Sequence, residues 1–182
     1  MLLNLHYMKT RWSLASQRMG MLKTIWSSSE LTVRTKVVVL VSCIFSRLLY
    51  AAESWTIKAA DGRKLLAFEM RCYRRILKVC WKDRIRNEVI REKVNRCHTI
   101  MDVIKHRKLQ LFGHICRMRN HRLVKLVTLG MTDGNRPRGR PTRRWSDDIA
   151  DWCGCTLPEA VHMANDRDKW RTITGLNGPH GS

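Results

Sequence analysis

Hydrophobic residues recur every three or four positions along most of the chain, which is the spacing of amphipathic helices. The clearest example lies between residues 63 and 80, where one face of the predicted helix carries Leu65, Phe68, Cys72, Ile76 and Val79. A second helix is predicted from residue 100 to about residue 118, because the apolar positions again follow this period. Thr99 and Asp102 precede it in the arrangement of a capping box.

The amino-terminal part has a less regular pattern. Residues 11–28 predict a helix, the serines at 27–29 interrupt it, and any one of these serines could cap the next helix. Residues 30–49 are predicted to form a buried helix; their β-branched content leaves a strand as the alternative, but about twenty residues is long for a strand. Asp61-Gly62 predicts a turn, and Asn87 with Glu88 predicts another helix start.

Residues 130–141 contain three glycines and two prolines, and we predict an extended loop or linker there. Beyond it, Trp145, Ile149 and Trp152 share a helix face, and Gly154 is placed to end that helix. A final helix is expected to start at Thr156, with Pro158 in its first turn and Glu159 as the acid of a capping box. It is expected to carry Ala160, Met163, Arg167 and Trp170.

The predicted fold is therefore mainly α, with small helical bundles joined by a basic loop that contains glycine and proline. We divide the chain into a basic helical region at 1–129, a linker at 130–144, a carboxy-terminal helical pair at 145–174 and a frayed tail at 175–182.

The charge balance adds a partner to this picture. The chain has 35 Lys+Arg and 15 Asp+Glu, a net charge of +20, which favours a polyanionic partner. The partner could be nucleic acid or an anionic membrane surface, or the charge could serve no specific partner. We favour nucleic acid (RNA, an RNA–DNA hybrid or DNA) over a membrane. Two basic clusters on predicted helices are expected to contact its backbone: Arg74, Arg75 and Lys78, and Lys105, Arg107 and Lys108.

The loop carries a third basic group, Arg136-Pro137-Arg138-Gly139-Arg140-Pro141, which resembles the core of an AT-hook. Prolines keep such a segment extended and glycine lets its backbone approach the narrow minor groove of A·T-rich DNA. Minor-groove binding is thus the first interpretation of this segment. The second is contact with backbone phosphates alone, and the third is a basic linker that binds no ligand. We include Arg136, Arg138, Gly139, Arg140, Arg143 and Arg144 among the candidate contacts.

Several classes of protein are excluded by the sequence. The most apolar run, 37–52, contains Arg47 and is shorter than the ~20 residues of a spanning helix. No secretory pattern begins the chain, so we expect a nuclear or cytoplasmic protein with reduced cysteines. Phosphate-binding GxxxxGK[ST], HExxH and GxSxG motifs are absent, and we expect neither an enzyme nor a cofactor.

Two sets of residues have side chains of the types that bind metals: Cys97, His98, His114 and Cys116, and Cys153, Cys155 and His162. Neither has the paired spacing of a zinc finger, so core packing is favoured. Asp147-Asp148 resembles the acidic pair of a polymerase, which needs two carboxylates to hold two metal ions. Here it lies at a helix start, where acids complement the helix dipole.

Six segments resemble, in order, the carboxy-terminal part of the reverse-transcriptase polyprotein of non-LTR (LINE-type) retrotransposons. They are Tyr-Ala-Ala-Glu-Ser-Trp at 50–55, Phe-Glu-Met-Arg-Cys-Tyr-Arg-Arg-Ile at 68–76, Trp-Lys-Asp-Arg-Ile-Arg-Asn at 81–87, Arg-Lys-Leu-Gln-Leu-Phe-Gly-His at 107–114, Arg-Gly-Arg-Pro-Thr-Arg-Arg-Trp at 138–145 and Asp-Arg-Asp-Lys-Trp-Arg at 166–171. The likeness covers roughly residues 22–171. The chain departs from the family pattern in two places. Ala51-Ala52 replaces a short segment that contains glycine in the family, and the family's Cys/His knuckle has no counterpart in this chain.

The resemblance implies a thumb and carboxy-terminal extension, whose role in the family is to hold the template–primer duplex. The catalytic acidic motif and the endonuclease of that family belong to regions that this chain lacks, so no catalytic residue is carried over. We therefore expect a non-catalytic nucleic-acid-binding fragment of a retrotransposon. The alternatives are a protein-interaction module, docking through its Trp-bearing helices onto a polymerase fragment encoded elsewhere, and a degenerate product without function.

Overall fold

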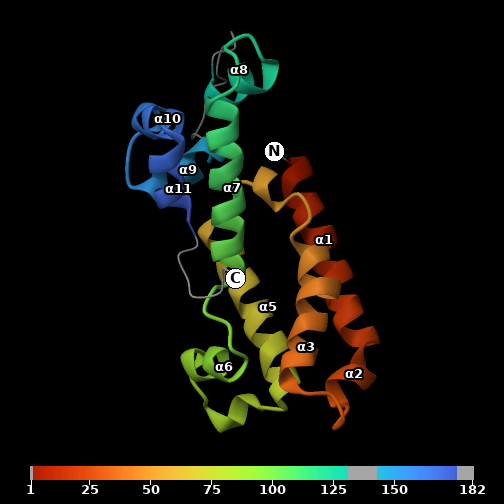
Figure 1. Ribbon diagram of the computed structural model, residues 1–182. Coiled ribbons are helices and arrows are strands. Elements are labelled where there is room, and N and C mark those ends of the chain that lie inside the picture. Colours follow the sequence, from red (N-terminus) through yellow and green to blue (C-terminus); the bar gives the residue numbers. More distant parts are fainter. Residues whose placement is uncertain (1, 131–142, 176–182) are drawn as a thin grey trace. The chain divides into compact units, whose positions relative to one another are not determined.

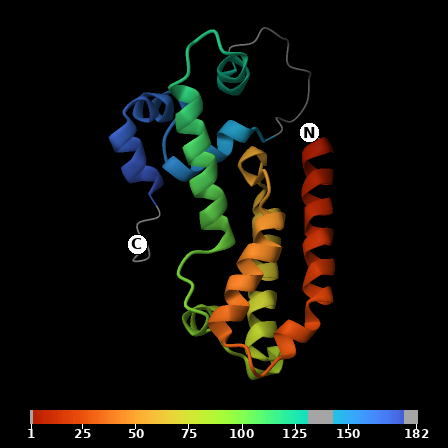
Figure 2. The same ribbon diagram turned by 45° about the vertical axis from the view of Figure 1, so that its right-hand side comes forward.

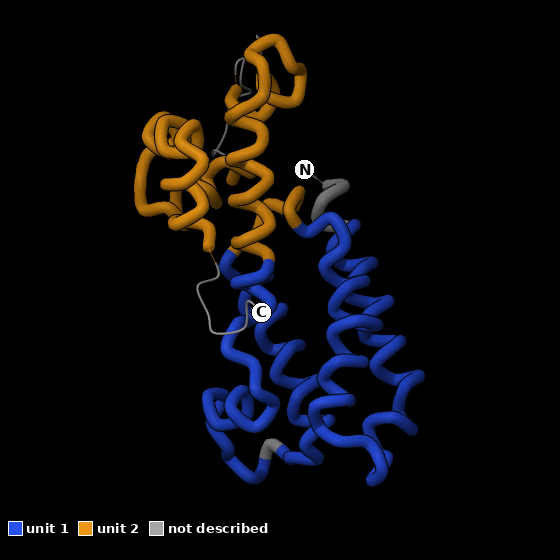
Figure 3. Tube along the Cα trace, in the orientation of Figure 1, with its two compact units in different colours: residues 1–52, 59–103 blue, residues 53–58, 104–182 orange. Residues whose placement is uncertain are grey.

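A computed structural model describes residues 2–130 and 143–175 of the chain (Figure 1). Within these ranges the chain forms helices and no strand, which confirms the mainly α prediction. The helices fall into two compact units (Figure 3). Unit 1 comprises residues 1–52 and 59–103, and unit 2 comprises 53–58 and 104–182. The boundaries between these units do not coincide with the predicted ends of the linker at 130 and 144. Helix α7 (Ile100–Cys116) starts in unit 1 and continues in unit 2.

Unit 1 is built on three long helical segments that run side by side (Figures 1 and 2). Its elements are α1 (Leu2–Met21), α2 (Lys23–Ser27), α3 (Val33–Val39), the π-helix η1 (Leu40–Phe45), α4 (Ser46–Leu48), α5 (Ala59–Leu77), the 3₁₀-helix η3 (Trp81–Asp83) and α6 (Asn87–Lys93). The 3₁₀-helix η2 (Ala52–Ser54) lies where the chain passes to unit 2. The run 33–48 is helical throughout, so the helix and not the strand alternative is correct for this segment.

Apolar side chains from all three segments form the core of unit 1. Trp26, Leu40, Ile44, Leu65 and Tyr73 are fully or almost fully buried. The indole nitrogen of Trp26 donates to the carbonyl of Met19, 2.9 Å away, so this large ring is buried with its polar atom satisfied. Burying such side chains is the main stabilising term of a helical unit of this size.

Glu69 is a buried acid that ties α5 to its neighbours in unit 1. Its carboxylate accepts from the backbone N–H of Ile100 at 3.1 Å and from the hydroxyl of Tyr73 at 3.2 Å, and it lies 3.5 Å from the guanidinium of Arg91. Burial raises the pKa of this carboxyl, and Arg91 opposes the rise. A buried charge in such a setting needs these partners, so Glu69 is a structural residue.

Unit 2 packs three short helices against one side of α7 (Figure 1). They are α9 (Trp145–Cys153), α10 (Leu157–Asn165) and α11 (Arg167–Thr174), and α8 (Leu123–Leu129) follows α7 in the chain. Their shared core contains Leu109, Phe112, Cys116, Ile149, Ala160, Ala164 and Trp170. Ile149, Ala160 and Trp170 are buried as predicted, and Trp145, Trp152 and Met163 pack against them. Arg167, predicted on the same helix face as Ala160 and Trp170, is exposed.

Helix α11 runs antiparallel to α7 and approaches it closely at a glycine. The Trp170 indole nitrogen donates to the carbonyl of Leu109 at 2.9 Å, and the His106 ring nitrogen Nδ1 donates to the carbonyl of Thr174. A Cβ atom at Gly113 would lie 2.3 Å from the Trp170 indole nitrogen. Only glycine leaves room for this contact, because real Cβ atoms do not come that close to a neighbour.

Several predicted helix ends are confirmed. Asp102 accepts from the N–H of Thr99 at 2.8 Å, and Glu159 accepts from the N–H of Thr156 at 2.8 Å, as the capping boxes predict. Gly154 adopts φ 65° and ends α9 in the left-handed region, again as predicted.

Other predicted boundaries are wrong. Asp61-Gly62 forms no turn, since both residues lie buried in the first turns of α5. Thr32, and not a serine at 27–29, caps the helix that follows, accepting from the N–H of Thr35. The last helix is two helices, because Asp166 accepts from the N–H groups of Asp168 and Lys169 and starts α11 there. Residues 145–174 thus hold three helices where a pair was predicted.

No helix in the described part of the chain has the length and apolar character required to cross a membrane.

Candidate nucleic-acid interface

A basic groove lies at the carboxy-terminal end of α5, within unit 1. Its volume is about 670 Å³, and it is lined by Ala67, Arg71, Arg74, Arg75, Val79, Cys80, Arg84 and Ile85. Arg71, Arg75 and Arg84 are exposed, and none of these lining side chains is acidic. We call this hollow the α5 groove. Guanidinium groups of one sign around a concave surface attract phosphate, which they bind in a planar, bidentate manner.

Arg74 positions the wall of the α5 groove. Its guanidinium donates to the carbonyl of Ile85 at 3.1 Å and to the side-chain oxygen of Asn87 at 2.8 Å. These bonds hold the segment that carries Arg84 against α5. Arg74, predicted as a nucleic-acid contact, is thus at least partly engaged in the protein's own structure.

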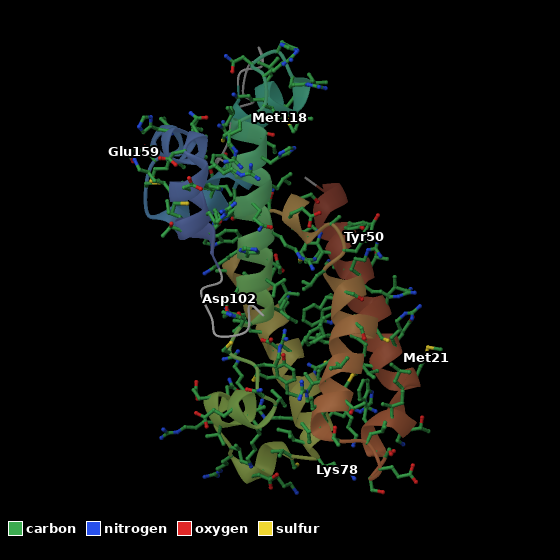
Figure 4. All side chains as sticks on the ribbon, in the orientation of Figure 1. Met21, Tyr50, Lys78, Asp102, Met118 and Glu159 are labelled. Carbon is green, nitrogen blue, oxygen red and sulfur yellow. The ribbon has the colours of Figure 1, made fainter. Side chains whose placement is uncertain are left out.

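Lys78 ends α5 in a strained backbone conformation. Its φ is 56°, in the left-handed region that favours glycine. The N–H of Lys78 bonds the carbonyl of Arg75 and the N–H of Val79 bonds that of Arg74, which is a Schellman motif. The lysine side chain is exposed, and Figure 4 labels it at the end of α5. Lys78 therefore adds positive charge next to the α5 groove without lining it.

The second predicted cluster does not form one surface. Arg107 is exposed on α7, and Lys105 is half-buried with its ammonium 5.8 Å from the centre of the Trp152 ring. Lys108 is completely buried. The prediction that Lys108 contacts nucleic acid is wrong, because its ammonium has no access to a phosphate outside the protein.

Lys108 instead forms a buried ion pair in unit 2 with Asp148, whose side chain is also completely buried. The Lys108 ammonium donates to the Trp55 carbonyl at 2.8 Å and lies 4.9 Å from the centre of the Trp145 ring. Burial lowers the pKa of Lys108 to about 8, and Asp148 opposes this shift. The ion pair fixes residues 53–58 to the core of unit 2.

Asp148 is shared among several donors. Besides Lys108, it accepts from the N–H of Ile57 at 3.0 Å and from Arg143 Nε at 2.7 Å. Arg143 also reaches Asp151 at 2.6 Å, and hydrogen bonds to these acids raise the pKa of its guanidinium, against the effect of burial. Arg143 is thus occupied within the protein, whereas its neighbour Arg144 is exposed.

The acidic pair at the start of α9 is fully engaged. Asp147 accepts from the N–H of Arg144 at 2.7 Å, as expected of an acid at a helix start. Asp148 belongs to the buried ion pair, which the helix-dipole interpretation did not foresee. The other loop candidates, Arg136, Arg138, Gly139 and Arg140, lie outside the described residues.

The cysteines and histidines form no metal-binding group of three or more ligand residues within the described ranges. Cys116 is buried, as core packing predicts, but Cys97 is exposed. His114 is exposed on α7, so its interpretation as a core residue is wrong.

Two groove arginines were missing from the sequence-based set. Arg71 lies four residues before Arg75 and seven before Lys78, a spacing that places all three near one helix face, so the sequence held this signal. Arg84 follows η3 and reaches the α5 groove only through the tertiary fold, for which the sequence gives no local sign.

The chain is similar to an uncharacterized transposon-derived protein of Caenorhabditis elegans. The two sequences are 24% identical over an alignment of 146 residues, which covers 75% of this chain and 52% of the relative. The chain thus spans about half the length of this relative. No family model and no solved structure match the chain. The similarity supports a transposon origin.

Proposed function

We propose that the chain is a non-catalytic, nucleic-acid-binding protein of transposon origin, equivalent to the thumb and carboxy-terminal extension of a non-LTR reverse transcriptase. The α5 groove carries this proposal. Arg71, Arg75 and Arg84 surround it with positive charge, and all its lining arginines lie in two of the segments that resemble the reverse-transcriptase family, 68–76 and 81–87. The similarity to a transposon-derived protein agrees with that origin.

Binding through the α5 groove would be mainly electrostatic. Each arginine that neutralises a phosphate releases counterions, so affinity falls steeply with salt concentration. The bound molecule would be a nucleic-acid backbone, as in an RNA–DNA hybrid, because the described lining residues of the groove offer positive charge and fork-shaped donors, and none of them is aromatic.

The acidic pair on α9 supports the non-catalytic part of the proposal. A two-metal polymerase site needs carboxylates that are free to hold two ions. Asp147 caps α9 and Asp148 neutralises Lys108 and Arg143, so neither carboxylate is oriented for that task.

The experiment compares two double variants of α5 that remove the same charge. Arg71→Gln/Arg75→Gln changes the groove, whereas Arg63→Gln/Lys64→Gln changes exposed residues at the other end of the helix. Affinity for a short RNA–DNA hybrid is measured by fluorescence anisotropy at several salt concentrations. The groove variant should lose at least about tenfold in affinity and reduce the slope of log K against log[salt] by about 1.8, from about 0.9 for each phosphate contact.

The control variant should lose less than about threefold. Equal losses in both variants would mean that net charge alone attracts the hybrid, and absence of binding by the unmodified chain at low salt would refute the proposal. Circular dichroism of both variants confirms that the helices remain folded.

A protein-interaction module is the second candidate, and one observation favours it. Leu123, Val124 and Val127 are exposed on α8, at 71%, 53% and 58% of their surface. The Trp-bearing helices are a poorer docking surface than predicted, since Trp170 is buried and Trp145 contacts Phe112 in the core. Replacing Leu123 and Val127 by Ser should then abolish binding to a co-expressed polymerase fragment of the same element and leave hybrid affinity unchanged.

A further inference from the structure

A second basic groove lies in unit 2, between α7 and α11. Its volume is about 310 Å³. Gln110, His114 and Arg117 line it from α7, and Arg167, Arg171 and Thr174 line it from α11, with the Trp170 ring between them. None of these lining side chains is acidic. We call it the α7/α11 groove.

The helix period explains why these side chains converge. On α7 the three lining residues lie at positions i, i+4 and i+7, and on α11 Arg167, Arg171 and Thr174 repeat the same spacing. Because the helices are antiparallel and held together by the Trp170–Leu109 and His106–Thr174 hydrogen bonds, the two rows face one gap. The close approach at Gly113 keeps that gap narrow.

One arginine of the groove is fixed in place by the protein. Arg117 Nη1 donates to the carbonyl of Ala164 at 2.6 Å, which holds its guanidinium at the carboxy-terminal end of α10. Arg167 and Arg171 extend from the opposite wall and are exposed. Two acids lie at the start of α11, and neither lines the groove: Asp166 caps the helix and pairs with Lys169, and Asp168 lies in its first turn.

We propose that the α7/α11 groove binds a phosphate group of the nucleic-acid backbone, as a second contact separate from the α5 groove. This inference rests on the proposed nucleic-acid-binding function. Three guanidinium groups and an imidazole suit a phosphodiester oxygen, and the Thr174 hydroxyl and Gln110 amide add neutral hydrogen-bonding groups. The groove can take one or two adjacent phosphates and is too small for a duplex.

The test compares single variants on the same helix. Arg171→Gln removes a groove charge, and Lys169→Gln removes a charge from a residue of α11 that does not line the groove. With the full chain and the same RNA–DNA hybrid, Arg171→Gln should weaken binding about three- to tenfold and reduce the salt slope by about 0.9. Lys169→Gln should weaken it less than twofold.

A second measurement reports on the groove itself. The indole N–H of Trp170 is followed by NMR while inorganic pyrophosphate is added, with the signal assigned by a Trp170→Phe variant. The unmodified chain should show a saturating shift, and Arg171→Gln should show none, while Lys169→Gln behaves as the unmodified chain.

The outcomes separate this inference from the proposed function. If Arg171→Gln and Lys169→Gln weaken hybrid binding equally, or neither does, while Arg71→Gln/Arg75→Gln still weakens it, the α7/α11 groove is not a phosphate site and the proposed function stands. An absent pyrophosphate shift in the unmodified chain also overturns the inference. If the unmodified chain does not bind the hybrid, the proposed function fails and the inference with it.

Discussion

Removing Asp148 should destabilise the protein more than removing Lys108, although the two side chains form one ion pair. In Asp148→Asn, the fully buried Lys108 ammonium keeps the Trp55 carbonyl and the tryptophan rings, but a neutral amide replaces its counterion. Leaving a buried charge without its counterion costs about 3–5 kcal/mol. We therefore expect the free energy of unfolding to fall by about 4 kcal/mol.

In Lys108→Met, the carboxylate of Asp148 retains Arg143 at 2.7 Å and the N–H of Ile57 at 3.0 Å. Methionine still fills the space beside the rings of Trp145 and Trp152. What is lost is the ion pair and the partner of the Trp55 carbonyl, and an unsatisfied buried acceptor costs about 1–3 kcal/mol. A loss of about 2 kcal/mol is expected, half of that for Asp148→Asn.

Urea denaturation followed by circular dichroism and by tryptophan fluorescence measures these differences. Asp151→Asn is the matched control, because Asp151 lies on the same helix and pairs with the same Arg143 but is 58% exposed. Exposed pairs contribute about 0–1 kcal/mol. If Asp148→Asn costs no more than Asp151→Asn, or if Lys108→Met costs more than Asp148→Asn, the assignment of this ion pair as a buried structural centre is wrong.

Three further predictions follow from single features of the structure. Gly113→Ala should lower the free energy of unfolding by about 1–3 kcal/mol, because the new Cβ would overlap the Trp170 indole; a neutral effect in urea denaturation would contradict the close α7–α11 contact. Lys78→Gly should raise the free energy of unfolding by about 1 kcal/mol, because glycine relieves the left-handed backbone, and removing the lysine charge should also weaken hybrid binding. Asn95→Gly should give a smaller gain in stability, because asparagine tolerates φ 53° better than lysine tolerates φ 56°. A loss of stability in Lys78→Gly would show that the backbone there is unstrained. The free energy of unfolding should fall as pH rises above 9, since unfolded thiols then ionise while burial raises the pKa of Cys72 to about 12 and that of Cys116 to about 11. Lys108, whose pKa is lowered, raises the free energy of unfolding as pH rises above 8, in the opposite direction to the thiols. The fall in stability at alkaline pH is therefore measured in the unmodified chain and in Cys72→Ala/Cys116→Ala, where it should be smaller. An equally steep fall in the variant would assign the pH dependence to other groups.

The features that the sequence predicted correctly depend on neighbours in the chain. The capping boxes at Thr99 and Thr156 and the left-handed Gly154 involve residues only a few positions apart, so local chemistry determines them. Asp61-Gly62 shows the limit of this approach, because packing in unit 1 draws a turn-forming pair into a helix. The start of α11 within the predicted last helix depends on Asp166, whose short carboxylate can cap a helix that the apolar period alone runs through.

The candidate site also combines features that the local sequence can predict with features that depend on the tertiary fold. Lys108 lies four residues from both Ile104 and Phe112, on their buried face, so the helix period already placed it in the core; its basic neighbours suggested a surface instead. Its partner Asp148 is forty residues away, and nothing local pairs the two. Likewise, the α7/α11 groove joins residues 110–117 to residues 167–174, and only the tertiary fold brings these two rows together.

Titration of a short RNA–DNA hybrid with the unmodified chain at increasing salt concentrations tests most directly whether the protein binds nucleic acid through phosphate contacts. Arg71, Arg75 and Arg84 in the α5 groove, with Arg167 and Arg171 in the α7/α11 groove, provide several exposed guanidinium groups. With about 0.9 in slope for each contact, the plot of log K against log[salt] should have a slope between about −3 and −6. No binding at low salt, or a slope shallower than about −1, would contradict this account.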